Sequence, residues 1–400
     1  MKKLLLSAAL LLLLTACAFG GDIEDGGRVS FNPIPSVSQS PPPSETPTPT
    51  PTPTPPPTPT PTPNPAARIQ MAGDILLHGY LLNAAKVGDS YDFVPYWADI
   101  KPYIDGDLSI CNMEGPVDAF GGNEKISTYP RFNAPIEILD ALKYAGFDAL
   151  VTANNHAYDR AFDGLVKSRE NLENAGFLVT GTNGTQEQYD EYLIVDLNGV
   201  KVGLIAYSEL DNGLGGIIPE EKRKFAMRKF NIGTADVEKM AADMAECRKQ
   251  GADMIILSLH WGVEYANKPG DAAVAMARAL AENGADVVMG NHSHCVQPIE
   301  WTETTRGKRL IIYSLGNFFV DQNALEPPIP RTQFGMLVTV SAEINKGELS
   351  LAAEYLPTFM RKYSEGGVRK YSLMPAVEGD DVTGAAYEHV TKIVGDISSG

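Results

Sequence analysis

Four of the six histidines in this 400-residue chain lie in three short polar clusters. The clusters are Asn154-Asn155-His156, His260-Trp261-Gly262 and Gly290-Asn291-His292-Ser293-His294. Each follows an apolar run that predicts a strand. Neutral imidazole is the commonest protein ligand for transition metals, and carboxylate or amide oxygens beside it favour divalent ions of intermediate softness. The clusters therefore predict a metal site at the ends of strands.

Two further strand ends supply acidic oxygens. Asp74 follows the run Arg68–Ala72, and Glu114 follows the run Leu108–Cys111. The candidate metal ligands are Asp74, Glu114, Asn155, His260, His292 and His294. Two divalent ions that share one carboxylate would lower the pKa of a water between them and clamp the attacked group. His156 is then left free as a general acid or as a stabiliser of an oxyanion.

Each motif also has a simpler explanation. Asn154-Asn155 could cap a helix within a turn, His260 could be a hydrogen-bonded core residue, and Gly73-Asp74 could be an ordinary turn. Because five such clusters all fall at strand ends, their joint occurrence favours the metal site.

The remaining histidines and the cysteines carry less information. His78 and His389 fit no cluster, and we expect them at the surface or in packing. Cys111, Cys247 and Cys295 are an odd set without CxxC spacing, so no disulfide framework is predicted. Cys295 is an outside candidate ligand because it follows His294.

Strands alternate with helices along the globular part of the chain. The expected strands are Arg68–Ala72, Leu108–Asn112, Asp148–Thr152, Met254–Leu259, Asp286–Met289 and Leu310–Ser314. The expected helices are Ile136–Ala145, Leu165–Ala175, Ala235–Gln250, Ala272–Asn283 and a terminal Tyr387–Val394. Asn198-Gly199 predicts a hairpin between 191–197 and 201–207, and Lys346-Gly347 predicts another between 334–343 and 349–355. This order favours a layered α/β domain whose ligands lie beyond the carboxyl ends of strands.

The charge of the chain excludes two classes of partner. Residues 1–65 hold three of the 33 basic and four of the 50 acidic residues, which leaves the rest with a net charge of −16. Such a surface repels nucleic acid and anionic lipid, so we expect neither as a partner.

The first 17 residues have the pattern of an export signal. Met1-Lys2-Lys3 is basic, Leu4–Leu14 is an apolar run too short for a membrane span, and small residues precede Cys17. The cysteine resembles that of a bacterial lipobox, which implies that Cys17 becomes lipid-modified and anchors the chain outside the cytoplasm. An ordinary secretory signal with an incidental cysteine is the alternative.

Residues 18–65 lack the composition of a core. Pro and Thr alternate from Pro41 to Pro65, which favours an extended polyproline II rod. We interpret this segment as a disordered stalk that holds the domain at 66–400 away from the membrane. A proline-rich ligand for an SH3-like partner is the alternative, but the repeat lacks basic anchors.

Seven motifs in order resemble the poly-γ-glutamate capsule synthesis (CapA) family over about residues 67–320. They are Met71-Ala72-Gly73-Asp74, Asn112-Met113-Glu114-Gly115, Arg131-Phe132-Asn133-Ala134-Pro135, Ala153-Asn154-Asn155-His156-Ala157-Tyr158-Asp159, His260-Trp261-Gly262, Gly290-Asn291-His292-Ser293-His294 and Tyr313-Ser314-Leu315-Gly316-Asn317-Phe318. That family resembles the calcineurin-like metallophosphoesterases. The resemblance implies a four-layer α/β/β/α sandwich with a dinuclear site.

The resemblance also assigns the ligands. Asp74 and His294 belong to one metal, Asn155, His260 and His292 belong to the other, and Glu114 bridges them. His156 falls at the catalytic histidine of the phosphoesterases. Three positions depart from the family pattern. Asp74 is followed by Ile75-Leu76, where Asp-x-His is typical, Glu114 stands where Asp is usual, and Asn291 stands where many capsule-family members carry a histidine.

Three functions remain open from the sequence. The family implies a membrane-anchored protein that helps capsule-synthesis membrane proteins to polymerise, export or anchor poly-γ-glutamate. The chain could act as a metal-dependent phosphoesterase with Mn, Fe or Zn, in which Arg131 and Asn317 are candidate substrate-binding residues. It could instead be a non-catalytic subunit that binds the anionic polymer, or a scaffold whose ligands never converge.

Overall fold

The computed structural model describes residues 64–322 and 330–398, and residues Pro61–Gly400 form one unit. The predicted signal segment, Cys17 and almost all of the predicted stalk lie outside the described residues. Among the described helices, none has both the length and the apolar character needed to cross a bilayer.

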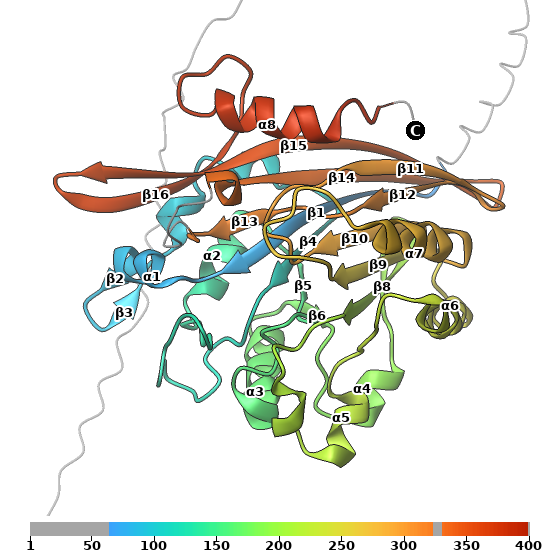
Figure 1. Ribbon diagram of the computed structural model, residues 1–400, viewed down its shortest axis with the longest axis horizontal. Helices are drawn as coiled ribbons and strands as arrows, with labels where there is room; N and C mark the ends of the chain where they lie inside the picture. The colour runs from blue at the N-terminus through green and yellow to red at the C-terminus, as the bar shows by residue number, and fades with distance from the viewer. Residues whose placement is uncertain (1–63, 323–329, 399–400) are drawn as a thin grey trace, which may run out of the picture. The chain divides into compact units, whose positions relative to one another are not determined.

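The first of two large sheets is built around β1 (Figure 1). Its strands, in spatial order, are β16 (Val368–Pro375), β15 (Glu348–Glu365), β14 (Phe334–Asn345), β1 (Ala66–Leu76), β4 (Leu108–Met113), β5 (Ala149–Val151) and β6 (Leu178–Thr180). Strands β1, β4, β5 and β6 run parallel to one another, whereas β14, β15 and β16 form an antiparallel meander. The short strand β13 (Asn317–Val320) also pairs with β1, in parallel.

The second sheet has a parallel centre and antiparallel edges. Its order is β11 (Ile299–Thr304), β12 (Gly307–Ile312), β10 (Val287–Asn291), β9 (Met254–His260), β8 (Val200–Ser208) and β7 (Leu193–Leu197). Strands β8, β9, β10 and β12 run parallel to one another. Both sheets therefore send the carboxyl ends of several parallel strands toward a common edge, where α/β proteins bind ligands.

The space between the sheets is filled by alternate residues of the central strands. Ile69 and Met71 of β1 pack in one buried cluster with Ile256 of β9 and Met289 of β10. Because side chains alternate across a strand, the neighbouring residue Ala72 belongs to a different cluster on the other face. This inner layer fixes the register of both sheets.

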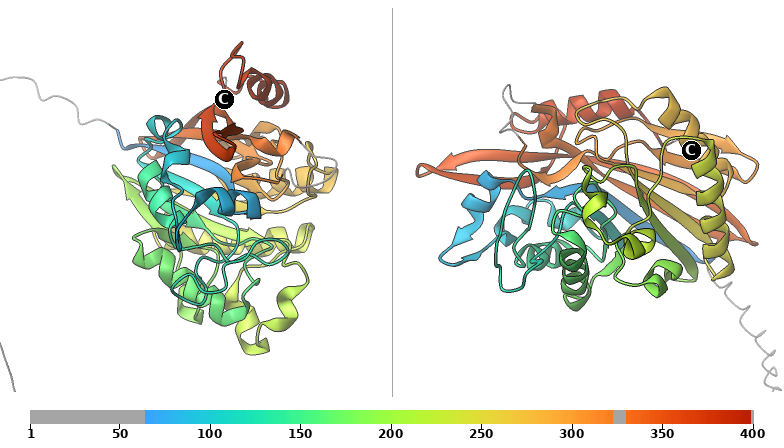
Figure 2. Two further views of the ribbon diagram at one scale, coloured as in Figure 1. Left: turned by 90° about the vertical axis from the view of Figure 1, so that its left-hand side faces the viewer. Right: turned by 60° about the horizontal axis from the view of Figure 1, so that its bottom comes forward.

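Helices cover the two outer faces. Helix α2 (Ile138–Ala145) packs on the first sheet, and α6 (Thr234–Lys249) and α7 (Asp271–Glu282) pack on the second. Figure 2 shows the resulting order of helix, sheet, sheet and helix. The fold is thus the predicted four-layer α/β/β/α sandwich. Helix α8 (Gly384–Val394) is added beside β14 and β15.

Most predicted elements are present within a few residues of their expected bounds, and both predicted hairpins form as β7–β8 and β14–β15. Several short elements were not predicted. They are α1 (Gly79–Ala85), β2 (Lys86–Val87), β3 (Ser90–Tyr91), α4 (Gln186–Asp190), α5 (Glu220–Ala226) and strands β6, β11, β13 and β16. Helix α3 (Ala161–Asn174) begins four residues before its expected start.

Close backbone approach occurs where the connection from β12 to β13 passes β1 of the first sheet and β10 of the second. The amide N–H of Asp74 donates to the carbonyl of Gly316 over 3.1 Å, between β1 and the start of β13. A Cβ on Gly73 would lie 1.8 Å from that oxygen, and a Cβ on Gly290 would lie 2.0 Å from the carbonyl oxygen of Tyr313. Only glycine fits at these two positions.

We expect Gly73→Ala to lower the free energy of unfolding by about 3 kcal/mol, because the added methyl overlaps backbone that cannot move without shifting β13. Thermal denaturation measures this loss. Gly216→Ala is the matched control, since its Cβ would meet nothing within 4 Å. Equal melting temperatures for the two variants would contradict the packing argument.

Candidate metal centre

The predicted ligands converge at the carboxyl ends of strands from both sheets. Glu114 directly follows β4, and His260 is the last residue of β9. His292 and His294 follow β10 on a turn in which both have positive φ, 91° and 55°. Asp74 was expected after a strand, but it lies within β1, next to a register shift in the pairing of β1 with β4 and another in its pairing with β13.

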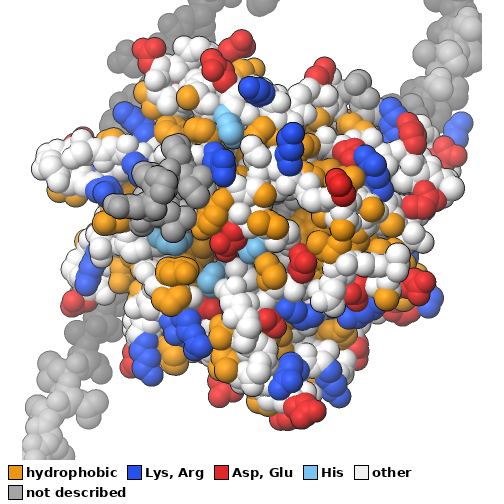
Figure 3. Space-filling view, in the orientation of Figure 1, with side chains coloured by type: hydrophobic (Ala, Val, Ile, Leu, Met, Phe, Trp, Pro, Cys, Tyr) orange, Lys and Arg blue, Asp and Glu red, His pale blue; other side chains and the backbone are white. Residues whose placement is uncertain are grey.

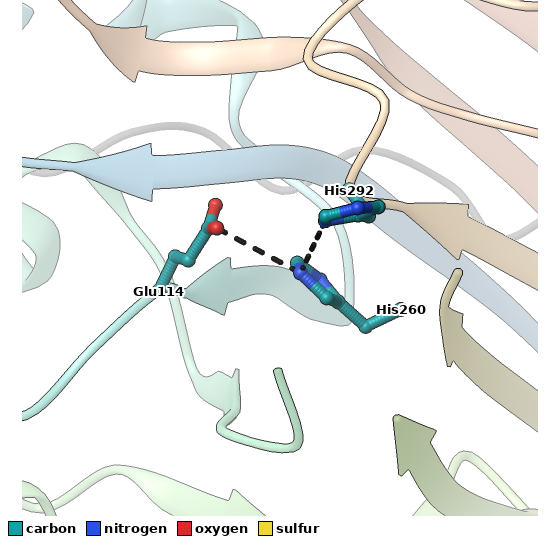
Figure 4. A group of neighbouring side chains, drawn as sticks. All are labelled: Glu114, His260 and His292. Carbon is teal, nitrogen blue, oxygen red and sulfur yellow. Dashed lines mark hydrogen bonds and ion pairs between the residues drawn. The ribbon is translucent and has the colours of Figure 1, made fainter. Parts of the chain in front are cut away.

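One group of donor atoms is formed by Glu114, His260 and His292 (Figure 4). The Nδ1 atom of His292 lies 3.1 Å from Nε2 of His260, which lies 3.7 Å from Oε1 of Glu114. The side-chain oxygen of Asn155 lies 2.9 Å from the same Nε2 atom. An imidazole nitrogen, a carboxylate oxygen and an amide oxygen therefore surround Nε2 of His260.

A second group shares Glu114 with the first. It contains Asp74, Glu114 and His294. Oδ2 of Asp74 lies 3.2 Å from Nδ1 of His294, and Oε1 of Glu114 lies 3.9 Å from Nε2 of the same ring. The structure thus places Glu114 in both donor groups; its role as a bridging carboxylate stays a prediction.

The spacing and the hydrogen bonding of these ligand atoms suit a bound cation. Ligands about 2.1 Å from one ion lie roughly 3 to 3.5 Å apart, close to the spacings found in the first group. Oδ2 of Asp74 and both carboxylate oxygens of Glu114 are buried and accept no hydrogen bond from any described residue. Since an uncompensated buried carboxylate is costly, these oxygens suit a divalent cation.

The electrostatics favour the ligand form of two histidines. Burial and the neighbouring His294 lower the pKa of His292 to about 3, and burial also holds the pKa of His260 well below its usual range. Both imidazoles are therefore neutral near pH 7, with a lone pair for a metal. Burial alone would lower the pKa of His294, but Glu114 and Asp74 outweigh it and raise that pKa to about 9.

Amide side chains hold the ligands in place. Nδ2 of Asn112 donates to Oδ1 of Asp74 over 2.7 Å and lies 3.4 Å from Nδ1 of His260. Asn317 was predicted to bind substrate, but its Oδ1 lies 2.9 Å from Nδ1 of His294 and its amide donates to Gln322 and the carbonyl of Thr332. These contacts favour a positioning role for Asn317; its substrate-binding role stays a prediction.

His156 stands beside the donor groups and pairs with an aspartate. Its Nδ1 lies 2.8 Å from Oδ2 of Asp159, which also accepts the backbone N–H of Phe132 over 2.6 Å. An ionised carboxylate only accepts hydrogen bonds, so the pair places the ring proton on Nδ1 and leaves Nε2 free. The ring packs edge-on against Phe132, with 4.7 Å between centroids.

A cavity of about 350 Å³ opens at His294, a member of the second donor group. His156 and His294 line it together with His78, Phe132 and Glu264. In Figure 3 the histidine side chains near the centre of this face lie among apolar and acidic side chains. His78, expected at the surface or in packing, is thus part of the cavity wall.

Other predicted residues lie apart from the cavity. The side chain of Arg131 is exposed and is not among the residues that line the cavity, so its role as an anion clamp stays a prediction. Cys295 is buried but belongs to neither donor group, and His389 packs against Phe334 with 5.2 Å between ring centroids.

Three functional candidates escaped the sequence argument. Asp159 follows His156 by three residues, a spacing within one turn that could have suggested the pair. Asn112 lies in the same motif as Glu114, but the sequence analysis assigned a role only to Glu114. Glu264 carries no sequence signal, because only the tertiary fold brings its loop to the cavity.

We expect Mn²⁺ to raise the melting temperature of the full chain, because a cation that binds only the folded state stabilises it, by about 2.7 kcal/mol at 100 times the dissociation constant. Glu114→Gln should remove most of this shift, since Glu114 belongs to both donor groups. His389→Gln is the control and should keep the shift. A full shift in the Glu114 variant would contradict the site.

The chain resembles several known proteins over the part that builds this site. It is 27% identical to the capsule biosynthesis protein CapA of Bacillus anthracis over 63% of this chain and 59% of the relative. It is 28% identical to the PGA biosynthesis protein CapA of Bacillus subtilis over 62% of each chain. The chain therefore spans only about three-fifths of the length of these relatives.

A more distant likeness concerns the fold and the chemistry of the site. A 5′-nucleotidase of Vibrio vulnificus is 28% identical over 37% of this chain and 26% of its own length. Together with the two packed sheets and the buried donor groups, this likeness is consistent with a metallophosphoesterase-like sandwich and with divalent metals at its edge.

The family model for the bacterial capsule synthesis protein PGA_cap matches residues 68–322. This range contains all but the first two residues of β1, every later strand up to β13 and every predicted metal ligand. The chain therefore belongs to the PGA_cap family of bacterial capsule synthesis proteins.

Proposed function

We propose that this chain is a metal-dependent phosphoester hydrolase that serves poly-γ-glutamate capsule synthesis outside the cytoplasm. The observation that supports the hydrolase activity is the position of Glu114. This residue belongs to both ligand groups, and its two carboxylate oxygens are buried without a hydrogen-bond donor among the described residues. Membership in the capsule synthesis family supports the cellular role. The likeness to a 5′-nucleotidase supports the class of bond.

The ligand groups and His156 have different chemical roles. Two divalent cations, Mn, Fe or Zn, would supply Lewis-acid polarisation of the ester and a water of lowered pKa. Asp74, Glu114, Asn155, His260, His292 and His294 would hold them. His156 lines the cavity beside these groups, so its free Nε2 can hold a proton at the leaving oxygen.

Asp159 gives His156 a fixed orientation for this task. The hydrogen bond from Nδ1 fixes the tautomer, and Asp159 is itself held by the amide of Phe132. An aspartate in this position also stabilises the charged imidazole that forms when the ring takes a proton. The pair can therefore donate a proton and recover it.

A subunit that only binds the anionic polymer is less well supported. A tract of γ-linked glutamates carries one carboxylate per residue and needs several cations along its path. No Lys or Arg occurs among the described residues that line the cavity, and Glu264 adds a negative charge there. This wall suits a small ester with one anionic group at the metals.

We expect His156→Gln and Asp159→Asn to lower turnover of bis-p-nitrophenyl phosphate by between about 100-fold and 10,000-fold, because each removes a positioned proton donor or its orientation. Asp163→Asn, on the exposed side of α3, is the matched control. The Mn²⁺-induced thermal shift should survive in all three variants. Unchanged turnover in the His156 variant would refute the assigned role.

The proposal includes attachment to the outer face of the cell membrane through lipid-modified Cys17. The basic start, the apolar run and the small residues before Cys17 support it. The alternating Pro and Thr residues up to Pro65 would then act as a spacer of about 3.1 Å per residue between the lipid and the domain.

We expect Cys17→Ser to move the protein from the membrane fraction to the soluble extracellular or periplasmic fraction, because the acyl chains would have no attachment point. Cell fractionation followed by immunoblotting measures the change, with Cys247→Ser as the control. Retention of the Cys17 variant in the membrane would contradict lipid anchoring.

A further inference from the structure

The cavity beside the metal centre carries a free negative charge of its own. Glu264 lines the cavity, is exposed to solvent, and forms no hydrogen bond or ion pair with any described residue. It is not a member of either donor group at the metal centre. An unpaired carboxylate in a binding cavity calls for a cationic or hydrogen-bond-donating group on the ligand.

The loop that bears Glu264 is fixed rather than free. The amide of Gly262 donates to Oε2 of Glu209 over 2.9 Å, and the amide of Tyr265 donates to the carbonyl of Ser293 over 2.7 Å. Tyr265 is held at a φ of 64°, a left-handed conformation that a tyrosine rarely adopts. The contact to Ser293 ties this loop to the turn that carries His292 and His294.

Aromatic rings line the same cavity. Tyr129, Phe132 and Tyr265 contribute to its wall, and the side chain of Tyr129 is 73% exposed. The ring of Tyr265 lies 6.0 Å from that of His294, so the aromatic wall begins at the metal centre. Aromatic faces together with a carboxylate are the usual surroundings of a bound alkylammonium group.

A histidine of the wall adds a polar atom but no competing charge. Nε2 of His78 is buried and has no hydrogen-bond partner among the described residues. The ring packs edge-on against Phe132, with 5.2 Å between centroids. Burial and the neighbouring His294 lower the pKa of His78 to about 4, so this ring is neutral near pH 7 and does not repel a cation.

We propose that the cavity selects phosphoesters whose alcohol carries an ammonium group, with the phosphate at the metal centre and the ammonium between Glu264 and the rings of Tyr129 and Tyr265. The inference rests on the proposed function for the phosphate end. It adds an ammonium subsite, with Glu264 as the residue that determines specificity.

A pair of matched probes isolates the ammonium group. Phosphocholine and 3,3-dimethylbutyl phosphate have nearly the same shape and differ in the nitrogen charge. Calorimetric titration of the full chain in Mn²⁺ should show about tenfold tighter binding of phosphocholine, the combined effect of an exposed ion pair and a cation–π contact. Glu264→Gln should abolish this preference and leave the affinity for the neutral-tailed ester unchanged.

Two further variants guard against indirect effects. Glu238→Gln removes an exposed carboxylate from α6 and should keep the tenfold preference. Tyr129→Leu should reduce the preference without abolishing it. Equal affinities for the two probes in the unmodified chain, or a preference that survives Glu264→Gln, would overturn the ammonium subsite while leaving the hydrolase proposal intact. If neither ester binds the Mn²⁺-loaded chain, both proposals fail.

A lipid headgroup and a soluble ester present the same chemistry. Co-sedimentation with vesicles of phosphatidylcholine, compared with vesicles of phosphatidylglycerol, separates these sources. Binding to phosphatidylcholine that Glu264→Gln removes supports the subsite with a lipid as its source. Binding of free phosphocholine alone supports the subsite with a soluble ester as its source.

Discussion

The burial of two carboxylates with too few hydrogen-bond donors for their oxygens is the constraint on which this structure depends. Asp74 and Glu114 lie inside the protein, and three of their four oxygens accept no hydrogen bond from described residues. A buried ion costs several kcal/mol unless a charge of opposite sign compensates it. His260, the imidazole closest to Glu114, is neutral near pH 7, whereas His294, the imidazole closest to Asp74, has a pKa raised to about 9. One positive charge therefore faces two carboxylates. A bound divalent cation is the compensation that this arrangement fits.

The two-sheet architecture brings the buried carboxylates and the histidines together. Neither sheet alone holds the donor groups, since Asp74 and Glu114 come from the first sheet and His260, His292 and His294 come from the second. The connection from β12 to β13 can lie close to β1 and β10 because Gly73 and Gly290 have no side chain. Apolar packing between the sheets then maintains the separation of the donor atoms.

One cavity beside the metal centre gathers groups with different roles. His156, paired with Asp159, lines it together with aromatic side chains and the carboxylate of Glu264. A net charge of −17 for the whole chain makes this cavity an unfavourable path for a long polyanion. The same charge does not oppose a small ester whose anionic end reaches a cation and whose other end is positively charged.

The sequence by itself determined much of the fold and the identity of the donor side chains. Long elements such as β9 and α6 have clear apolar patterns, so they could be predicted within a few residues. The short strands β6 and β13 could not, because three or four residues carry too little periodicity and their pairing depends on distant neighbours. Likewise, Asn155 and the histidines were recognisable from their clusters at strand ends.

Only the tertiary structure decided how those donors are grouped and what surrounds them. It placed Glu114 between two sets of ligands, showed that Asn317 contacts His294, and brought His78 and Glu264 into one cavity. Glu264 lies 150 residues from Glu114 in the chain. Local pattern cannot encode such a meeting, because it follows from the register of two sheets and from close backbone contacts that form only when the whole domain has packed.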